Sequence, residues 1–371
     1  MSPRAFVALL VVTVIAAVGA AWITVARDTG TGVRGEGTLM FEGLAGRVND
    51  VHRIVVTRAD GPSTIESAEK DSELSWSLKE LYGYPVPFEM VRGVAAGMAQ
   101  LRAIEPKTAR PALYGRIHVN DPRREKDAKG ALVELYDSKG ASMASLIVGL
   151  DKGGLFGVGD IYVRHPGEER AWLARGKVPV PEKRVGWLNQ MIVEVDLPRV
   201  RETTLYVPGE EPLRVYKNNP DERDFLVEGM PEDHELKEIF AAEDIARSIQ
   251  SLAFEDVRPG AEIGFDFSAT PRARYVTFDG LVVETWMKES GGKKWIAVRA
   301  RANDEPAPVD QVDNDKVAAE VARINVVTGG WAYTINEFET KNLSKTRADV
   351  IRPKEAGKPA PAKPDGGAAP E

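Results

Sequence analysis

The stretch ALVELYDSKGASMASLIVG, residues 131–149, carries the pattern that decides the fold. Apolar residues alternate with other residues on both sides of a turn, as expected for two antiparallel strands with one buried face. A second stretch, ARYVTFDGLVVETWMK at residues 273–288, repeats the pattern with the turn shortened to Asp279-Gly280. The chain is therefore predicted to be rich in antiparallel sheet.

The elements before these two hairpins also occur twice, about 150 residues apart. A hairpin over Val51–Thr57 and Ser63–Ser67 corresponds to one over Val200–Leu205 and Leu213–Tyr216. After each hairpin comes a short strand and then a row of apolar residues at helical spacing: Phe88, Val91, Val94, Met98, Leu101 and Ile104 in the first half, and Ile245, Ile249 and Leu252 in the second. The first row predicts a helix over 88–104.

We interpret this order as an internal duplication. The stretches GDIYVRHPGEERAWL (159–173) and GGWAYTINEFETKNL (329–343) extend the match. An extra helix, with Val317, Val321 and Ile324 as its apolar positions, is predicted in the second half. Chance similarity between generic hairpin–helix units is the alternative interpretation.

The N-terminal stretch AFVALLVVTVIAAVGAAWITVA lies between Arg4 and Arg27 and contains no charged residue. It has the length of about 20 apolar residues that a helix needs to span a bilayer, and Trp22 suits the membrane interface. We expect an uncleaved single-pass anchor; a signal peptide cleaved near Val18-Gly19-Ala20 and a buried core helix are the alternatives. The short basic N-terminus favours an N-inside orientation, with the bulk of the chain on the periplasmic side of the inner membrane.

The predicted fold class is α+β: an N-terminal transmembrane helix followed by two duplicated β-rich modules, each an antiparallel sheet with one main helix. The stretch TGTGVRGEGT is typical of a linker, and the Pro-, Ala- and Gly-rich end from Arg352 onward is typical of disorder. The predicted segments are an anchor at 1–27, a linker at 28–47, modules at 48–198 and 199–350, and a disordered tail at 351–371.

The composition limits the partners and the chemistry. The 371 residues carry a net charge of −7 with no dominant basic patch, which argues against a nucleic-acid partner. The chain has no cysteine, so disulfides, thiol catalysis and cysteine metal sites are excluded.

The glycine-rich stretch VGLDKGGLFGVGDIYVR, residues 148–164, raises the question of a phosphate site. A dinucleotide fingerprint needs a strand, GxGxxG and then a helix whose N-terminus faces the phosphates. Here the strand sequence DIYVR follows the glycines, and no GK[ST] is present for a P-loop. We predict a turn or bulge between Leu146–Val148 and Ile161–Arg164.

No motif predicts catalysis, a cofactor or a metal site. The four histidines, His52, His118, His165 and His234, are far apart in the sequence. The acidic stretch DQVDNDKV (310–317) fails the EF-hand pattern at Ala318 and Ile324, so its aspartates are expected to cap a helix that begins near Lys316. No serine occurs in a GxSxG context.

Aromatic residues supply the candidate contacts. YGYPVP (82–87) precedes the first helix and is either a binding rim or a rigid turn. The tryptophans in strand-like surroundings are either core residues or a sugar platform: Trp172, Trp187, Trp286, Trp295 and Trp331. We predict Tyr82, Tyr84, Arg164 and Trp172 as ligand or partner contacts.

The order of short motifs resembles a known family. HRIVVTR, LSWSL, YGYPVPFEMV and LRAIEPKT are followed by IVG, the glycine turn, IYVR and AWLARG. This set resembles DUF4340, a bacterial domain of unknown function, over most of residues 40–345. The resemblance implies a membrane-anchored, envelope-facing protein, often encoded beside gliding-motility-like ABC transporter components, and supplies no catalytic residue.

We therefore expect a non-enzymatic, membrane-tethered accessory or scaffold protein with ABC-type membrane subunits as partners. One alternative is a module that binds an envelope polymer or small ligand through exposed aromatic rings. Another is an enzyme of unfamiliar type, which would need clustered carboxylates or histidines with perturbed pKa values in a cleft.

Overall fold

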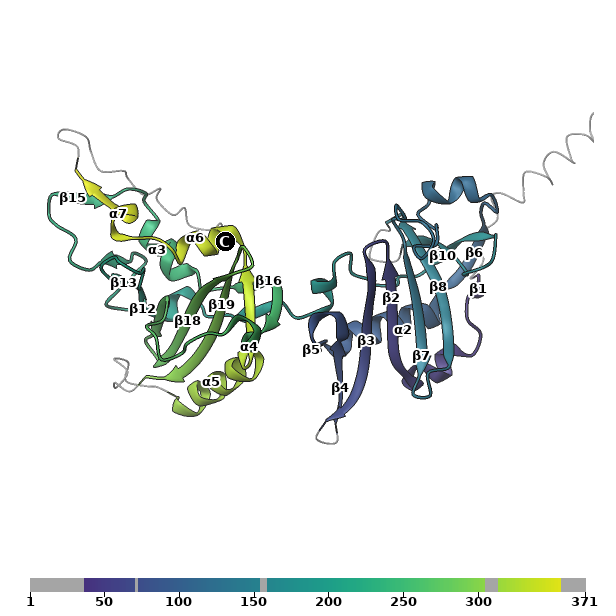
Figure 1. The fold of residues 1–371 in the computed structure, drawn as a ribbon, viewed down its shortest axis with the longest axis horizontal. Helices are drawn as coiled ribbons and strands as arrows, with labels where there is room; N and C mark the ends of the chain where they lie inside the picture. The colour runs from purple at the N-terminus through teal and green to yellow at the C-terminus, as the bar shows by residue number, and fades with distance from the viewer. Residues whose placement is uncertain (1–36, 71–72, 154–158, 304–312, 355–371) are drawn as a thin grey trace, which may run out of the picture. The chain divides into compact units, whose positions relative to one another are not determined.

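The computed structural model of the chain describes residues 37–70, 73–153, 159–303 and 313–354 (Figure 1). The chain divides into two compact units between Trp187 and Leu188, each with its own large antiparallel sheet. The protein is therefore a β-rich α+β protein with few helices, as the alternating hairpins predict. Among the described residues no helix is long and apolar enough to cross a membrane; the apolar run between Arg4 and Arg27 lies outside them.

The first unit contains a ten-stranded sheet in the order β1-β6-β10-β9-β8-β7-β2-β3-β4-β5. Its strands are β1 (Thr38–Leu39), β2 (Val51–Arg58), β3 (Gly61–Lys70), β4 (Glu73–Leu78), β5 (Tyr84–Pro85), β6 (Arg102–Pro106), β7 (Ala131–Asp137), β8 (Ser142–Asp151), β9 (Asp160–Arg164) and β10 (Ala171–Arg175). Part of the segment expected to be a linker thus belongs to this unit, because β1 pairs with β6 and the 3-10 helix η1 (Leu44–Asp50) follows it.

Helix α2 (Phe88–Gln100) is the main helix of the first unit, and it buries Val91, Val94 and Met98 at the predicted spacing. The prediction that it continues to residue 104 is wrong. Leu101 has extended backbone angles, and the chain then pairs with β10 as strand β6. Ladder hydrogen bonds thus replace helical ones over residues whose apolar spacing fits either structure. The remaining short helices of this unit are η2 (Lys79–Leu81), η3 (Pro111–Arg116) and η5 (Arg184–Trp187).

The second unit contains a nine-stranded sheet in the order β11-β16-β20-β19-β18-β17-β12-β13-β14, and a separate pair, β15 with β21. The strands are β11 (Met191–Val193), β12 (Val200–Leu205), β13 (Leu213–Tyr216), β14 (Leu226–Val227), β15 (His234–Leu236), β16 (Leu252–Pro259), β17 (Ala273–Thr277), β18 (Leu281–Ser290), β19 (Lys293–Ala302), β20 (Trp331–Ile335) and β21 (Ile351–Pro353). The start of the segment expected to be a disordered tail therefore forms β21.

The helices of the second unit are η6 (Leu197–Arg199), α3 (Ala241–Arg247), α4 (Gly260–Ile263), α5 (Asn314–Thr328), α6 (Glu337–Asn342) and α7 (Arg347–Val350). Helix α5 confirms the predicted extra helix: Val317 and Ile324 are buried, and the Asp313 side chain caps it by accepting a hydrogen bond from the backbone of Lys316. Helix α3 is shorter than its apolar row suggests, because Leu252 already begins β16.

The two large sheets have the same strand order when ten is added to each strand number of the first: β6-β10-β9-β8-β7-β2-β3-β4 corresponds to β16-β20-β19-β18-β17-β12-β13-β14. Helix α5 separates β19 from β20, whereas residues 165–170 alone join β9 to β10. The expected match between residues 159–173 and 329–343 is therefore shifted by one strand, because β20 takes the sheet position of β10 rather than that of β9.

The tryptophans lie mainly in the core. Trp187 and Trp295 are each 1 % exposed, and Trp286 is also buried. Trp172 and Trp331 are half-buried. The core interpretation is thus confirmed for three of the five rings, although Trp187 belongs to η5 and not to a strand.

Candidate functional site

The four predicted contact residues lie in two separate places of the first unit. Tyr82 is 45 % exposed and has a left-handed backbone after η2, while Tyr84 is buried on β5. Arg164 and Trp172 lie on the neighbouring strands β9 and β10, and five strands separate β9 from β5. The structure therefore does not bring the tyrosines and the Arg164–Trp172 pair into one site.

Arg164 is only 6 % exposed, and its donors are engaged within the protein. Its Nε and Nη2 atoms donate to the Val119 carbonyl at 3.0 and 2.9 Å, and Nη1 donates to the Glu168 carbonyl at 2.8 Å. The guanidinium also stacks over the Tyr114 ring at 4.4 Å. Arg164 thus holds the segment around Val119 against the sheet.

The glycine-rich stretch joins β8 to β9, which are adjacent antiparallel strands with a register shift between Val148 and Asp151. Residues 154–158 of this stretch lie outside the described residues. A Cβ atom on Gly149 would overlap the carbonyl oxygen of Ile117, so glycine here permits a close approach of two backbones. A strand, β9, follows the glycines, as the sequence predicts.

The histidines do not converge in the part of the chain that the structure covers. His52 bonds to the backbone carbonyl of Asp50, and His234 lies 2.8 Å from the Asp233 carboxylate. Within the described ranges, no three histidine, aspartate or glutamate side chains are grouped closely enough to hold a metal ion.

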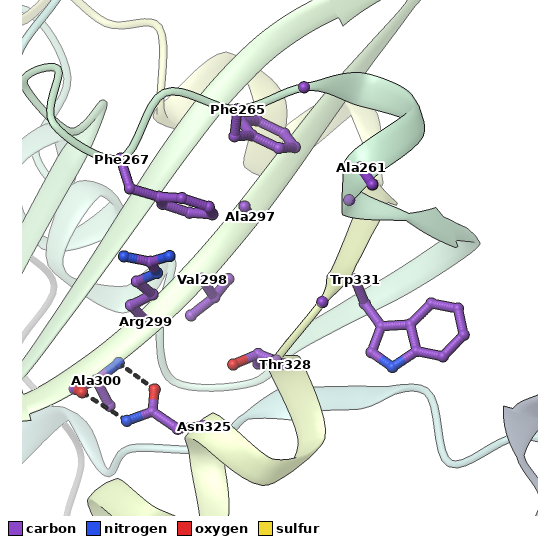
Figure 2. Close-up of a pocket in the computed structure, with 14 residues that line it drawn as sticks. Ala261, Phe265, Phe267, Ala297, Val298, Arg299, Ala300, Asn325, Thr328 and Trp331 are labelled. Carbon is purple, nitrogen blue, oxygen red and sulfur yellow. Dashed lines mark hydrogen bonds between the residues drawn. The ribbon is translucent and has the colours of Figure 1, made fainter.

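The candidate site is a cavity of about 470 Å³ in the second unit. Strand β19, the C-terminal end of α5, the start of β20, α4 and the segment after α4 surround it. Figure 2 shows Phe265 and Phe267 on one side of this cavity and Trp331 on another. A volume of this size, with mostly apolar walls and a few polar groups, is typical of sites for small ligands.

The cavity opens where β19 and β20 separate. Within the described residues, these strands pair only at Ile296 and Tyr333. Farther along β19, the Asn325 side chain of α5 makes the hydrogen bonds that a neighbouring strand would make. Its Oδ1 accepts from the Ala300 amide at 2.9 Å, and its Nδ2 donates to the Ala300 carbonyl at 2.8 Å (Figure 2). Because backbone groups alternate along a strand, the amide and carbonyl of Val298 face the same side.

Arg299 is the charged residue of the cavity lining. Its guanidinium carbon lies 3.3 Å from the centroid of the Phe267 ring, and Figure 2 shows the group beneath that ring. Phe267 in turn packs edge-on against Trp286, with the ring centroids 5.1 Å apart. Stacking on Phe267 restricts the guanidinium plane, and the Arg299 residue is exposed.

The acidic residue opposite Arg299 on β18 is Glu284, and it interacts with two other arginines. Its carboxylate lies 3.8 Å from Arg274 and 3.7 Å from Arg301. Among the described residues, no carboxylate forms an ion pair with Arg299. Among the described residues, Arg274, Arg299 and Arg301 thus lie on the same face of the sheet as Glu284.

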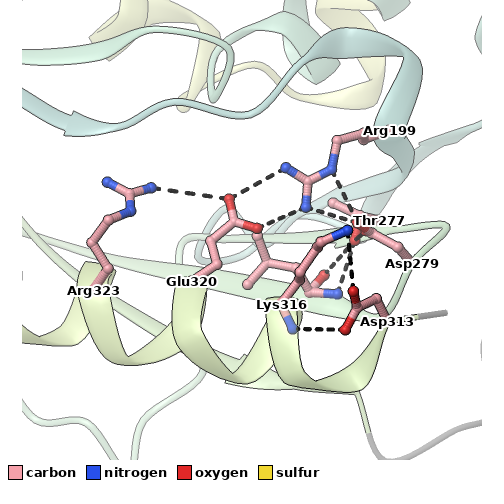
Figure 3. Close-up of polar contacts among 8 residues, drawn as sticks. Arg199, Thr277, Asp279, Asp313, Lys316, Glu320 and Arg323 are labelled. Atoms are coloured by element: carbon pink, nitrogen blue, oxygen red, sulfur yellow. Dashed lines mark hydrogen bonds and ion pairs between the residues drawn. The ribbon is translucent and has the colours of Figure 1, made fainter.

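A network of ion pairs fixes α5, which forms one wall of the cavity (Figure 3). The Arg199 guanidinium reaches Asp279 at 2.8 Å and Glu320 of α5 at 2.7 Å. Hydrogen bonding to Glu320 and the charges of both carboxylates raise the pKa of Arg199 despite the opposing effect of burial. The inserted helix is thus tied to the turn between β17 and β18.

One carboxyl group outside the cavity has an unusual environment. Burial, together with the charge of Asp244 on α3, raises the pKa of Glu339 on α6 to about 7. The Oε2 atom of Glu339 is buried without a hydrogen-bond partner. These two carboxyls belong to α6 and α3 and do not line the cavity. Their proximity therefore bears on the stability of the fold.

The sequence patterns did not predict the cavity. Phe267, Arg299 and Asn325 come from a loop, a strand and a helix that are more than 20 residues apart, and no motif links them. The one local signal is Phe265-Asp266-Phe267, two aromatic residues on a segment with no apolar periodicity. Phe267 of this segment packs against the β18–β19 hairpin, where it contacts Trp286 and Arg299.

Comparison with known families gives one match: the family model described as Domain of unknown function (DUF4340) covers residues 76–270, more than half of the chain. The chain belongs to this family. The match in this DUF4340 protein begins in β4 and ends before β17, so it spans parts of both units, and it is narrower than the residues 40–345 over which the motifs suggest a likeness. No curated protein and no solved structure matches the chain.

Proposed function

We propose that this DUF4340 protein is a membrane-anchored, envelope-facing, non-enzymatic accessory or scaffold subunit of an ABC-transporter-like, gliding-motility-like complex. The uncharged apolar run between Arg4 and Arg27 supports a single-pass anchor in the inner membrane. The family resemblance supports ABC-type membrane subunits as the partners and the periplasmic side as the location of both units.

We further propose that the two units arose by internal duplication. The support is their common strand order, including the position of the main helix before β6 and before β16. A duplicated sheet offers two related surfaces on one chain, which suits a scaffold that holds more than one partner subunit.

The observation that carries the scaffold role is that both units expose large apolar side chains at corresponding places, near the outer strand and at the start of the main helix. These residues are Leu74, Tyr82 and Phe88 in the first unit and Leu226, Met230 and Phe240 in the second. Large exposed apolar side chains at repeated positions are typical of protein–protein contact.

Crosslinking in intact membranes, followed by purification and mass spectrometry, tests this role. We expect ABC-type membrane subunits to be recovered in stoichiometric amounts with the full chain. Recovery of the protein alone would contradict the scaffold role, and turnover of a substrate that one side-chain substitution abolishes would contradict the non-enzymatic assignment. Protease accessibility in spheroplasts tests the periplasmic location, because an exported chain is digested there without lysis.

The second candidate function is a module that binds an envelope polymer or small ligand. The aromatic cavity of the second unit favours a small ligand, whereas the predicted aromatic contacts of the first unit give less support, because Tyr84 is buried. A polymer would need a row of exposed rings, and of the two tyrosines only Tyr82 presents one.

A further inference from the structure

We propose that the cavity between β19 and β20 binds a small organic acid, with a carboxylate held by Arg299 and a flat apolar group held by the surrounding rings. The assignment goes beyond the scaffold role and does not depend on it: the cavity lies within one unit and needs no partner chain.

The carboxylate subsite is inferred from the fixed orientation of the Arg299 guanidinium and from its lack of a described carboxylate partner. Stacking of Phe267 over the guanidinium holds its plane in place, at 3.3 Å from the ring centroid. A preorganised guanidinium offers two parallel N–H donors, which match the two oxygens of a carboxylate. No described carboxylate occupies these donors, although Glu284 lies opposite on the neighbouring strand.

Two further arginines lie near Arg299 on the same face of the sheet. Arg274 and Arg301 lie 3.8 and 3.7 Å from the Glu284 carboxylate. The C-terminal end of α5 would oppose an anion through its carbonyl groups. Two of these are engaged, however: the Tyr333 hydroxyl donates to Val327 and the Gly329 amide donates to Asn325.

The apolar part of the ligand has a matching place beside Arg299. Phe265 and Phe267 line the cavity together with the small residues of α4 and β19, and Trp331 lies at its edge with the ring directed away from Phe267 (Figure 2). The cavity of about 470 Å³ has room for a one-ring or two-ring acid. The backbone of Val298, which faces the gap between β19 and β20, provides a further polar contact for such a ligand.

Calorimetric titration of the full chain in nanodiscs tests the proposal, with 4-phenylbutyrate as the probe and empty nanodiscs as the blank. The neutral isostere 4-phenylbutan-1-ol should bind at least tenfold more weakly, because it lacks the charge-assisted bonds to Arg299. Arg299→Gln should weaken binding of the acid by tenfold or more. Arg258→Gln is the matched control: Arg258 is also exposed and stacked, 5.3 Å from the Trp295 ring, but does not line the cavity.

A second measurement covers the case in which Arg299→Gln disturbs the fold. In protein labelled with 5-fluorotryptophan, the acid should shift the ¹⁹F resonance of Trp331, and Phe267→Leu should reduce the affinity while Arg299 remains. The proposal is overturned if 4-phenylbutyrate does not bind at millimolar concentration. It is equally overturned if the alcohol binds as tightly as the acid, or if the two arginine variants behave alike.

Discussion

The half-buried carboxyl of Glu339 predicts a pH dependence of stability that one substitution should remove. Burial and the neighbouring Asp244 raise its pKa from 4.5 to about 7. Below pH 4.5 the group is protonated in the folded and unfolded chain alike, so it costs nothing. As the pH rises from 4.5 to 7, the unfolded chain releases this proton while the folded chain retains it, and stability falls. Above pH 7 the loss is complete.

The loss of stability can be calculated from the change in the pKa of Glu339. A change from 4.5 to about 7 corresponds to about 3 kcal/mol for a fully buried group. Because the side chain is only about half-buried, we expect about 1–2 kcal/mol after screening by solvent. Glu339→Gln should therefore be more stable than the wild type by about 1–2 kcal/mol at pH 8 and equal to it near pH 4. The gain should be local to α3 and α6, which carry the two carboxyls.

Hydrogen–deuterium exchange of peptides from α3 and α6 measures this difference, because at a given pH the intrinsic exchange rates of wild type and variant cancel. Glu337→Gln is the control on the same helix. That carboxylate is exposed, and a hydrogen bond and ion pair with Lys341 at 2.8 Å lower its pKa, so its replacement should not stabilise at any pH. A Glu339→Gln gain that is absent at pH 8, or that is the same at every pH, would contradict the assignment of the raised pKa to Glu339.

Three further substitutions test other parts of the account. Gly149→Ala should destabilise the first unit by about 2 kcal/mol or more, because its Cβ would overlap a backbone carbonyl oxygen; Gly46→Ala, which meets no atom, should have no such effect in thermal unfolding. Arg164→Met should cost about 2–4 kcal/mol in the same assay, since two carbonyls lose their donors; an unchanged midpoint would contradict its structural role. Glu320→Gln should weaken the tie to Arg199 by about 1 kcal/mol and speed hydrogen exchange at the start of α5, with no change in the first unit.

The hairpins and the inserted helix could be predicted from sequence because their signals are local. Alternation over residues 131–149 and 273–288 requires one buried face, and β7–β8 and β17–β18 form there as expected. The apolar spacing of α5 and its Asp313 cap likewise act within one helix. The end of α2 could not be predicted, because pairing of β6 with β10, more than 60 residues away, decides it.

The candidate site could not be predicted for the same reason. Arg299 lies in a strand whose sequence pattern does not set it apart. What makes it a candidate contact is the stacking of its guanidinium on the ring of Phe267, more than 30 residues earlier. The residue types of Tyr84 and Arg164 predict contacts, but pairing of β5 with β4 buries the tyrosine, and the Val119 carbonyl engages the arginine. The exposure of each side chain depends on the tertiary fold, which the sequence around Tyr84 or Arg164 does not determine.

The measurement that tests the scaffold role most directly is site-specific photocrosslinking in intact membranes. A benzophenone side chain replaces Tyr82 at the exposed edge of the first unit or, as the control, Phe338, which is exposed elsewhere. We expect a discrete adduct with an ABC-type membrane subunit from position 82 and none from position 338. No adduct at position 82, or the same adducts from both positions, would contradict the assignment of this edge as a partner surface.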